Sequence, residues 1–75
     1  MTDDLRGLID RYLSGADRSA SLVRRIEAEA TAEVGDDERF DELMEALALF
    51  RPGGGPPYLD EEGLAAAFRE ARAAL

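Results

Sequence analysis

Carboxylates are the side chains whose number and spacing could support chemistry in this sequence, and they gather in its middle. Residues 31–62 hold ten acidic residues and two arginines, so this stretch alone carries a charge of −8, equal to the net charge of the chain. Histidine and cysteine are both absent, which removes the commonest general base and the usual zinc ligands. Because histidine and cysteine are absent, the chain is expected not to be an enzyme. The clustered carboxylates instead indicate charge complementarity with a binding partner.

Part of this acidic cluster has a structural explanation. Acids in the first turn of a helix gain roughly 0.3–1 kcal/mol each from the helix macrodipole. The pattern places residues 36–38 at the start of a third helix and residues 60–62 at the start of a fourth. Four acids lie at the end of the second helix or beyond the first turn of the third, where the macrodipole does not favour them: Glu33, Asp41, Glu42 and Glu45.

The acids of the third helix are expected to form an exposed stripe opposite its apolar side chains, because successive residues turn by about 100°. The stripe consists of Glu38, Asp41, Glu42 and Glu45. Like charges at i, i+4 destabilise a helix by roughly 0.2–0.5 kcal/mol per pair, and Arg39 is the only nearby compensation. The expected pairs are Asp37/Asp41, Glu38/Glu42 and Asp41/Glu45. Since the fold does not need this stripe, the sequence predicts a basic protein as partner and excludes nucleic acid.

Tyr58 is the aromatic residue that stands apart from the helices. It follows the loop sequence PGGGPP and precedes an acidic run. It is interpreted first as a lid on the core and second as an exposed anchor, because tyrosine is enriched at binding hot spots. The full set of candidate partner-binding residues is Asp36, Asp37, Glu38, Asp41, Glu42, Glu45, Tyr58, Asp60, Glu61 and Glu62.

Two amphipathic helices are expected in the first half of the chain. The first has apolar residues at the i, i+3, i+4, i+7 spacing of one helix face, at Leu5, Leu8, Ile9, Tyr12 and Leu13. Thr2 or Asp3 is its expected cap, and Gly15 suits a left-handed exit. The second buries Leu22, Val23, Ile26, Ala30 and Val34. Its cap is Asp17 or Ser19, and Gly35 is its stop.

Two further helices are expected in the second half, on either side of the loop at residues 52–57. The third begins at Asp36 as its cap and ends at Phe50, before Arg51 and Pro52. The fourth begins at Asp60 as its cap. Short connections favour antiparallel neighbours, so the fold class is all-α, a compact antiparallel bundle of four short helices. Residues 1–75 are expected to form a single helical domain.

Other site types fit the sequence poorly. Di-metal sites in helical bundles need histidine, which is absent, and a bundle of this size offers little cleft for a glycosidase. An acyl carrier would need Asp-Ser-Leu at the start of the second helix. Here Ala20 precedes Ser21 and Leu22, and Ser19 and Ser21 are more simply caps. No metal and no cofactor are expected.

The composition also indicates the cellular location of the chain. The N-terminus is acidic, and no apolar run approaches the roughly 20 residues needed to span a bilayer, so a cytoplasmic protein without membrane contact is expected. It is expected to be a monomer when free. A second class of function stays open, that of a small adaptor subunit that binds a larger complex through an apolar face.

The order of these features resembles the colicin D type of bacterial immunity protein, a family of small acidic helical proteins that protect a cell from a nuclease toxin. The resemblance covers nearly the whole chain, in LRGLIDRYLSG, in GDDERFDELMEAL leading to Phe50, and in the closing YLDEEGLAAAFREARAAL. In that family the immunity protein binds the basic active-site cleft of a tRNA-cleaving toxin, and its carboxylates replace the RNA phosphates. The resemblance implies a cognate nuclease toxin as partner and the acids named above as contacts.

Overall fold

Four α-helices and one short 3-10 helix make up the part of the chain that the structure describes. The computed structural model describes residues 2–75, with side chains from Asp4 onward. The elements are α1 (Thr2–Leu13), α2 (Ala20–Val34), the 3-10 helix η1 (Glu38–Phe40), α3 (Asp41–Leu49) and α4 (Glu61–Ala74). None of the helices in residues 2–75 is long and apolar enough to cross a membrane.

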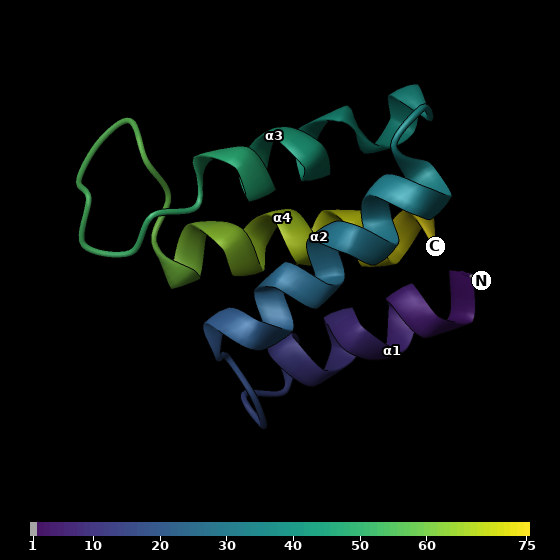
Figure 1. Cartoon of the computed structure of the whole chain (residues 1–75), viewed down its shortest axis with the longest axis horizontal. Coiled ribbons are helices and arrows are strands. Elements are labelled where there is room, and N and C mark those ends of the chain that lie inside the picture. The colour runs from purple at the N-terminus through teal and green to yellow at the C-terminus, as the bar shows by residue number, and fades with distance from the viewer. Residues whose placement is uncertain (1) are drawn as a thin grey trace.

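The helices pack as a ring in which neighbours run in opposite directions. α1 packs against α2 and α4, and α3 packs against the same two helices from the other side. Figure 1 shows the chain reversing direction from each helix to the next, so α3 and α4 are antiparallel and the loop between them projects at one end. The predicted antiparallel bundle of four short helices is therefore confirmed.

The core draws apolar side chains from all four helices and η1. At its centre, the rings of Tyr12 and Phe68 meet edge to face, with 5.0 Å between their centroids. The fully buried large side chains are Leu5, Ile9, Tyr12, Ile26, Leu64 and Phe68. Their spacing along each helix is the amphipathic pattern read from the sequence.

Polar contacts join α1 to the start of α4. The Tyr12 hydroxyl donates a hydrogen bond to the Glu61 carbonyl oxygen at 3.3 Å. The Arg18 guanidinium donates to the Tyr12 carbonyl oxygen at 3.1 Å, lies 5.0 Å from the centre of the Tyr12 ring and is 3.7 Å from a Glu62 carboxylate oxygen. Burial raises the pKa of the Tyr12 phenol, and the nearby acids of α4 add to this while Arg18 opposes it.

The first connection follows the predicted turn chemistry. α1 ends at Leu13, and Gly15 takes the left-handed conformation with a φ of 82°. Ser19 caps α2, since its hydroxyl accepts a hydrogen bond from the Leu22 amide at 3.2 Å. In the turn before α2, the Asp17 carboxylate accepts a hydrogen bond from the Ser19 amide at 2.9 Å. Ser21 lies inside α2 and is not a cap. The predicted cap of α1 at Thr2 or Asp3 depends on side chains outside the described part of the chain.

The turn between α2 and α3 differs from the prediction. α2 ends at Val34 as expected, but Gly35 keeps a right-handed φ of −59°. Glycine is needed there because a Cβ atom would lie 2.5 Å from the Thr31 carbonyl oxygen. Asp37, not Asp36, caps the next element, which is the 3-10 helix η1. α3 then starts only at Asp41, because the Phe40 backbone leaves the helical region.

The loop after α3 and the start of α4 agree with the sequence pattern. α3 ends at Leu49, one residue before the predicted end, and Phe50 forms an isolated parallel bridge with Leu59. Asp60 caps α4 as predicted, since its carboxylate accepts from the Gly63 amide at 2.9 Å. The closed base of the loop therefore fixes the direction in which α4 begins.

Candidate functional site

The predicted acidic side of the third helix is exposed in the structure. Glu38, Asp41, Glu42 and Glu45 all have exposed side chains, and they are called the acidic stripe below. The apolar residues between them are directed inward: Phe40, Leu43 and Leu47 are buried, and Met44 is half-buried. This is the separation of faces that the 3.6-residue period predicted.

The late start of α3 corrects the explanation of two of these acids. Asp41 and Glu42 lie in the first turn of α3, where the macrodipole favours an anion, and not beyond it as predicted. Asp37 and Glu38 precede α3, so Asp41/Glu45 is the one predicted like-charge pair that lies within a single α-helix. Glu45 is consequently the exposed acid of the stripe with no role at a helix start.

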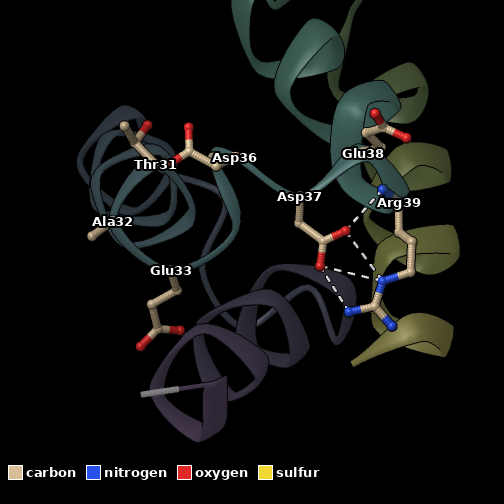
Figure 2. A pocket seen from close by; sticks show the side chains of 8 residues that line it. Thr31, Ala32, Glu33, Asp36, Asp37, Glu38 and Arg39 are labelled. Carbon is tan, nitrogen blue, oxygen red and sulfur yellow. Dashed lines mark hydrogen bonds and ion pairs between the residues drawn. The ribbon is translucent and has the colours of Figure 1, made fainter.

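Asp37 and Arg39 form a closed pair beside the stripe. The Arg39 guanidinium donates to both Asp37 carboxylate oxygens, at 2.7 Å through Nη2 and at 3.2 Å through Nε. The Arg39 amide also donates to Asp37 Oδ1 at 3.0 Å. Figure 2 shows the two side chains facing each other, with Asp36 and Glu38 directed away from them. These hydrogen bonds from Arg39 hold the pKa of the Asp37 carboxyl below its ordinary value.

An open hollow separates the end of α2 from η1. Residues between Thr31 and Arg39 line it, including Glu33, Asp36 and Asp37 (Figure 2). The Asp36 side chain is exposed, whereas both carboxylate oxygens of Glu33 are buried. Glu33, which the sequence left without a structural explanation, is therefore not part of the accessible acidic surface.

The acids at the start of α4 lie beside the end of α3, whereas the acidic stripe begins before the start of α3, at Glu38. Because α3 and α4 are antiparallel, Asp60, Glu61 and Glu62 lie near the end of α3, at the loop end of the molecule (Figure 1). Asp60 caps α4 and Glu62 faces Arg18. The structure thus divides the predicted acidic set into two groups, and in the group at the start of α4 the side chains of Asp60 and Glu62 have contacts within the fold.

Tyr58 is not a lid on the core. The residue is 40% exposed, and it is the only exposed large hydrophobic residue in the described part of the chain. Its ring lies against Arg51, with the guanidinium carbon 4.9 Å from the ring centre. The second interpretation of Tyr58, as an exposed anchor, fits this position.

The amino-acid sequence did not indicate that Arg51 contacts Tyr58. Arg51 and Tyr58 flank the loop sequence PGGGPP symmetrically, and this is the signal that could have indicated their pairing across it. Chain order alone does not show that the base of the loop closes, because the bridge between Phe50 and Leu59 is a tertiary contact.

Two other kinds of site, a metal site and a carrier site, can be compared with the described residues. No group of three or more acidic side chains within them is arranged to hold a metal ion. Ser19, at the start of α2, uses its hydroxyl as a helix cap, and Ser21 is exposed beside it without the preceding acid of a carrier site. Comparison of the chain with protein-family models, with curated proteins and with solved structures gave no match.

Proposed function

We propose that this chain is an immunity-type or antitoxin-like inhibitor that works in the cytoplasm and blocks a basic bacterial toxin. The acidic stripe on η1 and α3 binds the partner, and the chain itself carries out no reaction. The partner is a protein with a positively charged cleft, since the stripe repels the phosphates of nucleic acid. The observation that carries this proposal is the exposure of four carboxylates on one side of η1 and α3.

The distribution of cations around the stripe supports this role. Within residues 31–62 the only basic residues are Arg39 and Arg51. Arg39 is bound to Asp37 and Arg51 lies on Tyr58, so neither of them pairs with a carboxylate of the stripe. The stripe therefore keeps its charge for a partner, and complementary charge can raise association rates toward about 10⁸–10⁹ M⁻¹s⁻¹ at low salt.

The resemblance to colicin D type immunity proteins supports a nuclease toxin as the partner. A tRNA-cleaving enzyme must hold a polyanion, and carboxylates spaced along a helix can occupy the cationic positions that phosphates would take. The proposal therefore predicts competition: the toxin cannot bind this chain and its RNA substrate at the same time.

The adaptor function is the second candidate, and the surface gives it less support. An adaptor that docks through an apolar face should expose several large apolar side chains together. In the described part of the chain, Tyr58 is the only exposed residue of this kind. The charged surface is consequently the more extensive candidate interface.

The proposal is tested by co-expression with the product of the neighbouring gene, with survival and co-purification as readouts. The neighbour is expected to be toxic alone and to be silenced in a stable complex. Affinity should fall steeply between low and high salt, because the Debye length shortens from about 10 Å at 0.1 M to about 3 Å at 1 M. A complex whose affinity does not change with salt would refute the role of the stripe.

A matched pair of charge reversals locates the binding surface. Glu45→Lys reverses an exposed acid of the stripe, whereas Glu27→Lys reverses an exposed acid of α2. Glu45→Lys should weaken binding on the order of a hundredfold if Glu45 meets a partner cation. It should leave the fold intact or slightly firmer, since a like-charge pair is removed. Equal losses in both variants would show only a dependence on net charge.

A further inference from the structure

The loop at residues 51–58 protrudes from the bundle and is closed at its base. The Arg51 amide donates to the Leu59 carbonyl oxygen at 2.9 Å, and the Leu59 amide donates to the Leu49 carbonyl oxygen at 2.8 Å. All residues from 51 to 58 are exposed, and Figure 1 shows the loop extending past the ends of α3 and α4. The loop therefore adds almost nothing to the core.

Hydrogen bonds inside the loop give it a defined shape. The Gly54 amide donates to the Arg51 carbonyl oxygen at 3.0 Å, and the Tyr58 amide donates to the Gly55 carbonyl oxygen at 2.9 Å. Gly53 and Gly55 have φ values of 81° and 72°, which glycine adopts readily. A loop that is ordered before binding loses less conformational entropy when a partner immobilises it.

The Tyr58 ring is held in place on this loop. The Arg51 guanidinium lies 4.9 Å from the ring centre. A Cβ atom on Gly54 would lie 3.4 Å from Tyr58 Cδ2 and 3.1 Å from the Arg51 carbonyl oxygen, so the ring and Arg51 both pack closely on the Gly54 backbone. The loop thus presents one aromatic side chain that packs on its backbone and contacts one cation.

The choice of Arg51 as the partner of Tyr58 is informative because this region is acidic. Arg51 forms no ion pair with any described residue, although Asp60 lines the same hollow beside the loop. Tyrosine and arginine are two of the residue types most enriched at binding hot spots. The pair therefore consists of residue types typical of binding sites, and it lies on a loop of defined shape.

We propose that the 51–58 loop is a preformed docking loop that inserts into a pocket beside the basic site of the partner, with Tyr58 as its anchor and Arg51 as the residue that holds Tyr58 in place. This proposal rests on the proposed function, since the occupant is the same basic protein. α3, which carries three of the four acids of the acidic stripe, leads directly into the loop, and exposed acids at Asp60 and Glu61 follow the loop. A basic surface can thus face acids on both sides of the inserted loop.

Arg51→Gln tests the proposal, because the docking loop and simple electrostatics predict opposite changes in the affinity for the partner. Losing a cation makes the chain more acidic, so electrostatics alone would tighten binding to a basic partner. If Arg51 orients the anchor, the same substitution weakens binding severalfold. Arg25→Gln makes the same charge change at an exposed position on α2 and serves as control. The probe is the purified product of the neighbouring gene, with affinity measured at low and high salt.

Tyr58→Ala should weaken the affinity for the same partner at least tenfold. This loss of affinity should persist at high salt, because the contact made by the Tyr58 ring is apolar and is not screened. If Tyr58→Ala and Arg51→Gln leave the affinity unchanged while Glu45→Lys weakens it, the docking loop is refuted and the proposed function stands. If Tyr58→Ala weakens binding and Glu45→Lys does not, the loop contact stands without the acidic stripe. If the unsubstituted chain does not bind the probe, both proposals fail.

A second measurement needs no partner. Backbone ¹⁵N relaxation should show the amides of residues 53–55 as ordered as those of α3 on the ps–ns timescale. The Arg51→Gln variant should lose part of this order. Amides as mobile as a flexible linker in the unsubstituted chain would overturn the preformed loop.

Discussion

The Arg39 guanidinium binds both carboxylate oxygens of Asp37, the residue two positions before it, and 72% of the Arg39 side chain is exposed. An arginine placed in this way brings a positive charge to the edge of the acidic stripe without neutralising any of its four members. It occupies a carboxylate that a partner arginine could otherwise bind. The pair thus lowers the net attraction that the surface exerts on a basic protein.

Arg39→Gln should therefore strengthen binding to the proposed partner. The substitution removes a cation next to the stripe and frees Asp37. We expect association about fivefold faster at low salt, the size of effect expected for one unit charge near a partner cation in water. Stopped-flow kinetics at several salt concentrations measures it. Arg25→Gln on α2 is the matched control, and an equal gain in that variant would assign the effect to net charge.

The titration of Asp37 reports the same pair in the free chain. Its pKa is lowered from the ordinary 3.8 by the hydrogen bonds from Arg39. A carboxyl with a depressed folded pKa stabilises the fold above its unfolded pKa, and this contribution is lost as the pH falls through the folded pKa. Carboxyl ¹³C shifts should show Asp37 titrating below 3.8, and Arg39→Gln should move its midpoint upward. An unchanged midpoint in the variant would contradict the pairing.

The buried phenol of Tyr12 predicts a weakness at alkaline pH. Its pKa is raised from 10.0, mainly by burial. The folded chain holds this proton more tightly than the unfolded chain, so the stability is complete below pH 10 and falls as the pH rises through the raised pKa. Tyr12→Phe removes the hydrogen bond to Glu61 and should lower the free energy of unfolding by about 0.5–1.5 kcal/mol at neutral pH. In this variant the free energy of unfolding should fall less as the pH rises above 10.

Urea unfolding at pH 7 and above pH 10 measures the effect of Tyr12→Phe on the free energy of unfolding at neutral and at alkaline pH. Tyr58→Phe is the matched control, because Tyr58 is exposed and packs on the loop. It should leave the unfolding free energy unchanged at pH 7. Parallel pH profiles for Tyr12→Phe and the unsubstituted chain would show that the Tyr12 phenol is not the group responsible.

The helices and the core could be predicted because each depends on local pattern. The spacing of Leu5, Ile9 and Tyr12 identifies a buried face without any tertiary information. The caps at Ser19 and Asp60 were predictable for the same reason, since a cap bonds within three residues. The start of α3 was predicted too early, because a 3-10 turn and an α-helix share nearly the same period over so few residues.

The candidate site was less predictable, since it depends on contacts that sequence spacing does not encode. The burial of the Glu33 oxygens and the exposure of Tyr58 both follow from how segments pack. The sequence placed acids 36–45 and acids 60–62 in one set, whereas in the structure residues 36–42 lie before or at the start of α3 and residues 60–62 lie beside its end, next to the loop. Charge and exposure on α3 were predicted correctly because they depend on helical period alone.

Two glycines in the helical part of the chain should respond to alanine in opposite directions. Gly7 lies inside α1, and a Cβ atom there would meet nothing within 4 Å apart from the adjacent residues and backbone of its own helix, so Gly7→Ala should stabilise the chain by about 0.5–1 kcal/mol. A Cβ atom on Gly35 would lie 2.5 Å from the Thr31 carbonyl oxygen, so Gly35→Ala must displace the turn that leads to Asp37. Thermal unfolding distinguishes the two, because 1 kcal/mol shifts the midpoint by about 4–8 °C in a domain of this size. Loss of stability in Gly7→Ala would mean that α1 packs differently, whereas a neutral Gly35→Ala would show that the turn can relax without cost.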